Sequence, residues 1–405
     1  MVNDKLNFKI PDEWKIKHLD DFGNIVSGGT PSTAVSEYWN GLISWCTPSD
    51  ITRTDGTTIS ETEKTITNEG LKNSAAIILP IGSLLLCSRA TIGDSKINAI
   101  PMATNQGFKN IIPFKETCVK YLYYLLQTKK KEMFEKATAS TFAEISKSAL
   151  CEIALQTPQK KEQEIIAEVL SDIDALIVDL QKLIRKKKNI RQGTMQMLLT
   201  GKKRLDGFNK EWKNTTLDKI CDIKDGTHQT PHYVESGIPF YSVETVTNDD
   251  FIHVKYISLV EHERLTSSYK IENGDVLMTR IGSIGKGKYV DWYPNASFYV
   301  SLALLKFRGK KSLANFIALL TGTEEFQKEA ELHSLQFAIP MKINLGQISD
   351  IRVTIPTDDY EIEAIVEVLS NMDNEIKWLE KKLNKYKNLK QGMMEELLTG
   401  KVRLI

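Results

Sequence analysis

The segment IGSIGKGK at 281–288 has the glycine and lysine content of a phosphate-binding loop. Such a loop needs a glycine five residues before its Gly-Lys pair and a hydroxyl after it, so that backbone N–H groups hold the phosphates and the hydroxyl binds Mg²⁺. Arg280 occupies the first of these positions and Gly287 the second. We therefore do not expect a nucleotide to bind at this segment.

Histidines and paired acidic residues are the other types that could carry chemistry. His228 and His232 stand four residues apart, but Pro231 lies between them in a loop rich in Thr and Gln, which is a poor setting for two metal ligands. Acidic pairs such as Asp249-Asp250 are typical of turns. The sequence also has no Gly-x-Gly-x-x-Gly and no Asn-Pro-Pro-Tyr-like methyltransferase motif. We expect no catalytic site and no metal site.

Composition is that of a soluble globular protein, with 41% hydrophobic and 26% charged residues. The formal net charge of +1 does not indicate a nucleic-acid partner, so local patterns must carry that argument. Five cysteines without a Cys-x-x-Cys pair argue against a disulfide framework. The longest apolar run, 75–87, is broken by Pro80 and Gly82 and is too short to cross a bilayer. No signal peptide pattern opens the chain. We expect a cytoplasmic protein with no membrane partner.

A long repeat organises the chain and must position any functional loops. Residues 163–205 align with 362–404 at an offset of 199, with 23 identities in 43 positions and no gap. Each copy begins after a proline, Pro158 or Pro356, and ends at a glycine, Gly201 or Gly400, where a left-handed C-cap would close a helix. The repeat predicts two matched helices of roughly 55 Å each at 1.5 Å per residue.

Apolar residues in both copies alternate four and three apart, the 3.5-residue period of a coiled coil. A single copy of such a stripe is more typical of a core helix in a globular domain, but two matched copies favour pairing of the helices with each other. The residues expected to pair are Ile166, Leu170, Ile173, Ile177, Leu180, Ile184, Ile365, Leu369, Met372, Ile376, Leu379 and Leu383. The basic runs between them are expected on an outer face, where they could meet solvent, a partner or phosphate.

The segments before the helices also correspond weakly. Both open with Glu-Trp-Lys, continue to a polar loop ending in Thr-Pro, and later carry a strand-like run followed by a Ser/Thr-Arg pair and glycines. Short β-branched and aromatic runs between turn residues predict mixed α/β domains. The expected division is 1–158 and 206–356 as domains, followed by helical spacers at 159–205 and 357–405.

The pattern of two variable domains, each followed by a helix that begins EVLS-x-x-D and ends QG-x-M-x-x-LLTGK-x-RL, resembles the specificity subunit of Type I restriction-modification enzymes. The resemblance covers the whole chain. It implies an α+β fold in which two target recognition domains are separated by two long antiparallel helices, with an internal pseudo-two-fold repeat. Each domain would read one half of a split, asymmetric DNA target, and the paired helices would act as a ruler between the halves.

The resemblance also implies the partners. These are double-stranded DNA, two methyltransferase (modification) subunits that dock on the helices, and restriction or translocase subunits. No cofactor is expected in this chain, whereas the partner subunits are expected to use S-adenosylmethionine, ATP and Mg²⁺.

Recognition of DNA bases needs side chains with paired hydrogen-bond donors and acceptors, whereas hydroxyls and lysines contact the phosphates. In the first domain the polar loops offer Thr30, Ser32, Thr33, Thr47, Ser49, Arg89, Asn105, Gln106 and Lys109. In the second they offer Thr227, His228, Gln229, Thr230, His232, Tyr241, Glu244, Arg280, Ser283 and Lys286.

Each of these candidates has a structural alternative. Arg89 and Arg280 are taken to occupy matching places, so either could be a framework arginine that orders a loop, and the polar loops could be plain turns. Trp14 and Trp212 are expected in the core rather than as stacking platforms. For the whole chain, two further readings stay open. One is a two-domain nuclease or methyltransferase with an unrecognised site, and the other is a coiled-coil scaffold that binds protein.

Overall fold

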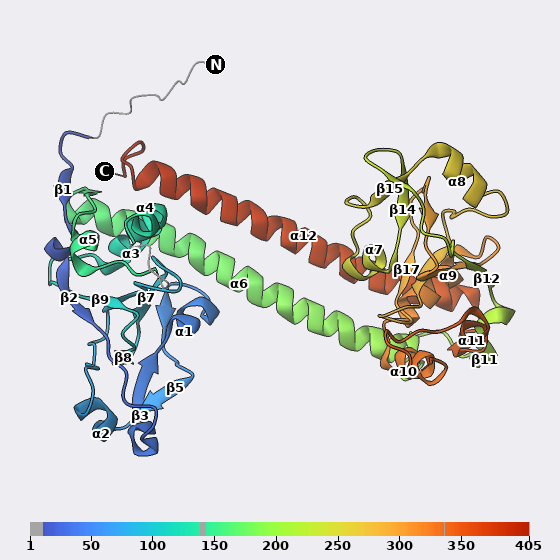
Figure 1. Cartoon of the computed structure of the whole chain (residues 1–405), viewed down its shortest axis with the longest axis horizontal. Coiled ribbons are helices and arrows are strands. Elements are labelled where there is room, and N and C mark those ends of the chain that lie inside the picture. The colour runs from blue at the N-terminus through green and yellow to red at the C-terminus, as the bar shows by residue number, and fades with distance from the viewer. Residues whose placement is uncertain (1–10, 138–142, 336, 405) are drawn as a thin grey trace. The chain divides into compact units, whose positions relative to one another are not determined.

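The structure is a computed structural model that describes residues 11–137, 143–335 and 337–404. Contacts divide the chain into two compact units (Figure 1). Unit 1 comprises 1–183 together with 379–405, and unit 2 comprises 184–378. This division differs from the linear one expected above, because each unit takes the first part of one long helix and the last part of the other. In the part of the chain described, no helix is long and apolar enough to cross a membrane.

Unit 1 holds two sheets and a short strand pair. The larger sheet has the order β2-β9-β6-β7-β4, the smaller has β5-β3-β8, and β1 pairs with β10. The strands are β1 (Lys15–Lys17), β2 (Gly23–Ser27), β3 (Trp39–Cys46), β4 (Thr58–Ile59), β5 (Lys64–Ile66), β6 (Leu84–Leu86), β7 (Ser95–Asn98), β8 (Ala103–Thr104), β9 (Lys109–Pro113) and β10 (Leu155–Thr157).

Short helices lie at both ends of these sheets in unit 1 (Figure 1). They are α1 (Pro48–Arg53), α2 (Asn68–Lys72), α3 (Val119–Thr128), α4 (Lys130–Glu135) and α5 (Lys147–Cys151). The α3, α4 and α5 helices lie beside the first turns of α6 (Lys160–Leu199), whereas β3, β5 and α2 lie at the far end of the unit (Figure 1). Six of the ten residues of α3, Tyr121 to Leu126, are buried in one hydrophobic core that also contains Leu19, Ile166 and Leu397.

Unit 2 repeats this plan. Its sheets have the orders β12-β19-β16-β17 and β13-β15-β14-β18, and β11 pairs with β20. The strands are β11 (Lys213–Thr216), β12 (Asp222–Asp225), β13 (Tyr233–Val234), β14 (Ile238–Tyr241), β15 (Lys255–Ile257), β16 (Val276–Thr279), β17 (Gly287–Tyr289), β18 (Ser297–Phe298), β19 (Leu302–Lys306) and β20 (Arg352–Ile355).

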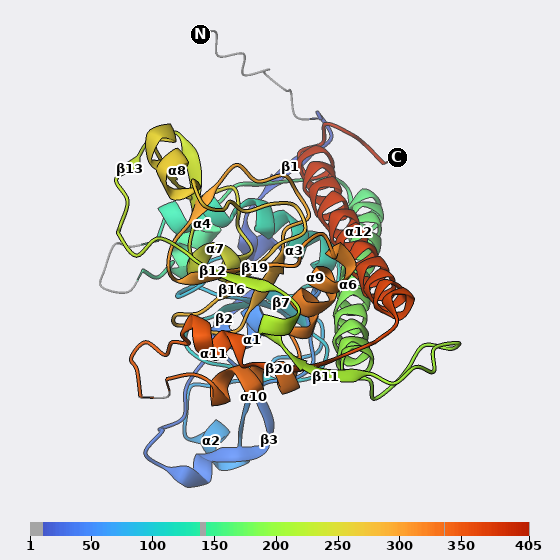
Figure 2. The same ribbon diagram turned by 90° about the vertical axis from the view of Figure 1, so that its right-hand side faces the viewer.

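The helices of unit 2 are α7 (Val243–Asn248), α8 (Leu259–Leu265), α9 (Lys311–Leu320), α10 (Glu324–Leu332), α11 (Leu345–Ser349) and α12 (Asp359–Leu397), the last of which continues into unit 1. The α9 helix packs near the ends of α6 and α12 that belong to this unit (Figure 2). Together they form a core that contains Leu199, Phe316 and Ile365.

The two domains share one skeleton although their sequences diverge. In each, a four-strand order recurs (β2-β9-β6-β7 and β12-β19-β16-β17), and a central strand pairs antiparallel on one side and parallel on the other (β3 with β5 and β8, β14 with β15 and β18). The strands β4 and β13 are the additions that distinguish the two domains. The expected mixed α/β domains and internal repeat are confirmed.

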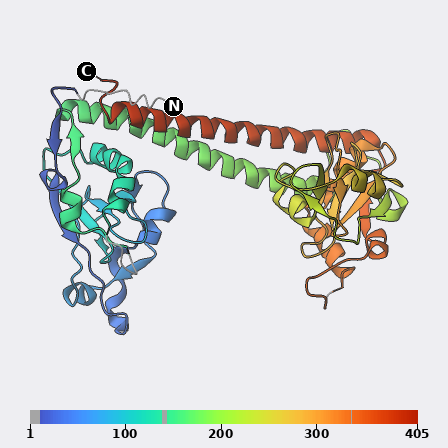
Figure 3. The ribbon, with the colours of Figure 1, turned by 45° about the horizontal axis from the view of Figure 1, so that its top comes forward.

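The two long helices are continuous, and α6 and α12 are drawn as uninterrupted green and red ribbons (Figure 3). The predicted starts after Pro158 and Pro356 and the left-handed glycines after each helix are confirmed, with φ of 69° at Gly201 and 76° at Gly400. Trp14 is 7% exposed, as expected for a core residue.

The helices run antiparallel, as ion pairs within each unit show. In unit 1, Asp174 of α6 meets Lys390 of α12 at 2.6 Å. In unit 2, Arg191 of α6 meets Asp373 of α12 at 2.8 Å. At the offset of 199, Asp174 corresponds to Asp373 and Lys390 corresponds to Arg191, so the sequence repeat produces the same contact in both units.

Nine of the twelve predicted seam residues are buried, but they pack against different neighbours. Ile166 and Leu170, like Ile365 and Leu369, belong to the hydrophobic cores of the domains. Further along each helix, Ile177 and other seam residues are buried outside those cores, whereas Leu180, Met372 and Leu383 are half-buried. Both interpretations of the stripe are therefore partly right, because each helix begins as a core helix and continues as a pairing helix.

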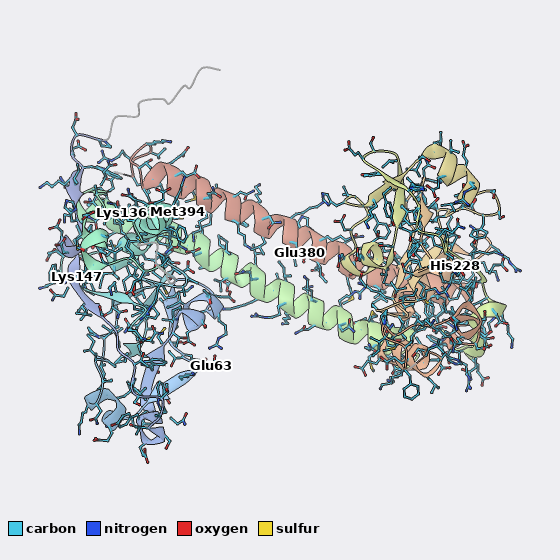
Figure 4. The ribbon with its side chains drawn as sticks, in the orientation of Figure 1. Glu63, Lys136, Lys147, His228, Glu380 and Met394 are labelled. Carbon is cyan, nitrogen blue, oxygen red and sulfur yellow. The ribbon has the colours of Figure 1, made fainter. Side chains whose placement is uncertain are left out.

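Each unit also contains a second ion pair between the two helix copies, and these two ion pairs match each other. Glu361 is fully buried and accepts from the guanidinium of Arg204 and from Trp212 Nε1, the latter at 3.1 Å. In unit 1, Glu162 is 3% exposed and accepts from Arg403 at 2.6 and 2.8 Å. Each of these ion pairs thus joins the end of one helix copy to the start of the other. Met394, near the end of α12, lies at the helical end of unit 1 (Figure 4).

Candidate nucleic-acid interface

Backbone hydrogen bonds align the loops of the two domains residue by residue. Asn105 N donates to the carbonyl of Cys46 at 3.0 Å, and Tyr299 N donates to the carbonyl of Tyr241 at 2.9 Å. Each bond follows a parallel strand pair in the same register. The alignment extends along the strands and loops to Trp45 with Phe240, Thr47 with Ser242, Ser49 with Glu244, and Lys64 with Lys255.

The same comparison corrects the expected match between Arg89 and Arg280. Cys87 and Thr279 each donate their N–H to the carbonyl seven residues further on and accept from the N–H six residues further on, so they are equivalent. The residue that follows Thr279 is Arg280, and its counterpart is Ser88. The sequence match is wrong by one position, because a shared Ser/Thr-Arg pair cannot reveal which residue of the pair continues the strand.

Arg280 and Tyr241 lie in the framework of domain 2. Arg280 is 7% exposed, and its guanidinium donates to Asp225 Oδ1 at 2.5 Å and to the carbonyl of Ile343 at 3.2 Å. Tyr241 is 4% exposed in a hydrophobic core. Their burial favours the framework alternative for both.

A surface cleft of about 420 Å³ in domain 1 gathers four of the sequence candidates, which are Thr47, Ser49, Arg89 and Asn105. They come from the start of α1 and from the loops after β6 and β8. Glu63 and Lys64 also line it and were not singled out from the sequence. Glu63 is visible at the edge of unit 1 (Figure 4). Only the pairing of β5 with β3 brings these two residues to the cleft.

Asp50 holds the side of this cleft formed by α1. Its side chain is 1% exposed, and one oxygen accepts from Thr47 N at 2.9 Å and from Thr47 Oγ1 at 2.7 Å. The other accepts from Arg53 at 2.8 Å and from Glu63 N at 3.0 Å. This network caps α1: the Thr47 hydroxyl donates to the Asp50 carboxylate and accepts from the Asp50 backbone N–H, so one lone pair of its oxygen is left for a ligand.

The other domain 1 candidates do not join the cleft. Thr30 donates a hydrogen bond to Gln106, and Ser32 and Thr33 are exposed on the loop after β2. Lys109 is only 14% exposed and donates to Ser27 Oγ and to a carboxylate oxygen of Glu144, both at 3.3 Å. Lys109 is therefore engaged inside the domain.

The domain 2 candidates spread over three loops. In the first, Thr227 is half-buried, and His228 bonds Asp225 at 2.8 Å while most of its ring stays exposed (Figure 4). Gln229, Thr230 and His232 follow on the same loop and are exposed.

The remaining domain 2 candidates lie on α7 and the loop after β16. Glu244 in the first turn of α7 and Ser283 are exposed. Lys286 is exposed, and its ammonium donates to the carbonyl of Thr247 at 2.7 Å.

Reactive groups are not assembled in the described part of the chain. Among the described residues there is no group of three or more His, Cys, Asp or Glu side chains that could hold a metal ion. The five cysteines are free thiols. Burial raises the pKa of Cys87 to about 12 and also raises the pKa of Cys46 and Cys221, so these thiols stay protonated at neutral pH and act as packing residues.

The chain is similar to a family of known proteins. A family model described as the Type I restriction modification DNA specificity domain matches the chain twice, at 11–192 and 209–388. The MjaIX specificity subunit of a Type I restriction enzyme from Methanocaldococcus jannaschii is 43% identical over 176 residues, which span 43% of this chain and 41% of that protein. The MjaVIII specificity subunit from the same organism is 23% identical over 413 residues, which span 98% and 94%.

A solved structure gives the same fold. The S subunit of the Type I restriction-modification system from M. genitalium superposes with a TM-score of 0.61 at 16% identity, and the alignment covers 97% of each chain. At this level of identity the likeness concerns the fold alone.

Proposed function

Because the chain belongs to the family of Type I restriction modification DNA specificity domains and carries two copies of that domain, we propose that it binds a bipartite DNA target. Each domain would read one half-site, and the paired helices would dock two methyltransferase subunits and, through them, restriction subunits. The chain itself would be non-catalytic and cytoplasmic. The partner subunits would supply the S-adenosylmethionine, ATP and Mg²⁺ chemistry.

One observation carries this proposal. The two domains keep the same strand orders and the same loop hydrogen bonds, but their loop side chains differ in kind. At equivalent places domain 1 has Ser49 and Asn105, whereas domain 2 has Glu244 and Tyr299. A conserved framework with different hydrogen-bonding groups is suited to reading two different sequences. The target would therefore be asymmetric.

Binding to DNA can be tested with the purified full-length chain. Phosphate contacts release counterions, so the logarithm of the binding constant should fall linearly with the logarithm of salt concentration. Affinity without any such salt dependence would favour the protein-binding scaffold instead. Addition of S-adenosylmethionine and Mg²⁺ to chain and DNA should give neither methylation nor cleavage, whereas either product would favour the enzyme alternative.

The bipartite target can be mapped in a strain that expresses the chain with its methyltransferase subunit. Sequencing of methylated adenines should return two different half-sites with a fixed spacer. A single continuous site, or a palindromic one, would contradict the assignment of one half-site to each domain.

A further inference from the structure

Arg89 lines the domain 1 cleft, and no described residue pairs with its charge. Among the residues that the structure describes, none forms an ion pair with its guanidinium or accepts a hydrogen bond from it. Glu144 is bridged to Arg89 in the sheet, but Lys109 pairs with the Glu144 carboxylate at 3.3 Å. Glu63 in the cleft pairs with Arg53 at 2.9 Å. Within the described part of the chain, the donors of Arg89 therefore have no acceptor.

Asn105 presents a second set of donors beside Arg89. Its Oδ1 accepts from the N–H of Gly107 at 2.8 Å, which fixes the direction of the amide and leaves its NH₂ group toward the cleft. A Cβ on Gly107 would lie 3.0 Å from Asn105 Oδ1 and 3.3 Å from Arg89 Cγ. The absence of a side chain at Gly107 therefore lets both groups pack side by side.

The equivalent place in domain 2 has different chemistry. Ile281 corresponds to Arg89, because it follows the counterpart of Ser88 and forms the same kind of backbone bridge, to Lys342. Tyr299 corresponds to Asn105. The donors that line the cleft in domain 1 are thus replaced by an apolar side chain and an aromatic ring.

We propose that Arg89, placed by Gly107 and flanked by Asn105, reads a guanine in the half-site of domain 1, and that Ile281 denies domain 2 the same preference. The major-groove edge of guanine offers two acceptors, N7 and O6, which the fork of an arginine can meet together. Asn105 is less suited to adenine here, since its oxygen is already engaged with a backbone N–H. Ile281 can meet only an apolar group, such as the methyl of thymine.

This inference rests on the proposed function, and the test uses the full chain with its methyltransferase subunit. The half-sites are first mapped for the unchanged protein. Arg89→Ala and Arg89→Lys should then both relax one G·C position of one half-site, by about 5- to 150-fold in discrimination, and leave the other half-site unchanged. The lysine variant is included because it keeps the charge but loses the fork. Arg308→Ala, which removes a 74% exposed arginine paired with Asp222, is the matched control and should leave both half-sites intact.

Two outcomes would overturn the inference. If Arg89→Ala weakens binding to all sequences equally and lowers the salt dependence by about one charge, Arg89 contacts a phosphate. If both half-sites keep their wild-type preferences at every position, Arg89 does not read the target. In either case the proposed function would stand, because it is tested separately, by the salt dependence, the lack of activity and the bipartite target of the unchanged protein.

Gly107→Ala offers an independent check on positioning. The added methyl should displace Arg89 and Asn105 and relax the same base pair as Arg89→Ala, with no change in the second half-site. Unaltered preference in this variant would show that Gly107 does not place the reading groups.

Discussion

The buried Glu361 offers the sharpest test of how the helices are joined to the domains. Replacing Arg204 by alanine removes two hydrogen bonds to a carboxylate with no exposed surface, whereas the hydrogen bond from Trp212 Nε1 at 3.1 Å is kept. Breaking a buried pair on one side costs about 3–5 kcal/mol, because the remaining charge is uncompensated. For a unit of about 200 residues this corresponds to a fall of roughly 6–20 °C in the midpoint of thermal unfolding.

The assay measures thermal unfolding of the full chain by calorimetry. The transition that contains unit 2 should move to lower temperature in Arg204→Ala. The double variant Arg204→Met with Glu361→Leu should recover most of the loss, because no charge is then buried, although Trp212 Nε1 loses its acceptor. Lys210→Ala is the control, since the Lys210 side chain is 67% exposed where it pairs with Asp358, and its midpoint should fall much less than that of Arg204→Ala. An Arg204→Ala midpoint equal to that of the control would refute the reasoning.

Three further perturbations address the seam, the helix ends and the division into half-sites. Ile173→Asp buries a charge at a position that is 5% exposed, so it should cost several kcal/mol and reduce assembly with the methyltransferase subunit. Asp172→Ala, on the exposed face of the helix, is the control and should leave assembly unchanged. Size-exclusion chromatography of the chain mixed with the subunit measures the assembly. Gly201→Ala forces an L-residue to a φ of 69° and should destabilise the chain by about 1–2 kcal/mol in a denaturant titration. Gly193→Ala, on the exposed face of α6 with open space around it, should stabilise the chain by about 0.5–1 kcal/mol in the same titration. Exchange of 206–356 for the second domain of another family member should change one half-site in the methylation map, and a change in both would contradict the modular division.

The sequence by itself determined the repeat, the helices and the class of fold. Matched prolines and glycines set the ends of α6 and α12, and the 3.5-residue period identified the faces to be buried, since both signals act within a few turns of one chain segment. The repeat also carried the ion pairs, because Asp174 with Lys390 and Arg191 with Asp373 are the same contact written twice.

Only the tertiary structure decided how the loops correspond and which candidates reach a surface. Two loops of different sequence are aligned by their backbone hydrogen bonds, and these show that Arg89 matches Ile281 rather than Arg280. Burial separates Arg280 from Arg89 although both follow a hydroxyl residue in sequence. The cleft in domain 1 likewise depends on the pairing of β5 with β3, a contact between segments about twenty residues apart that no local pattern specifies.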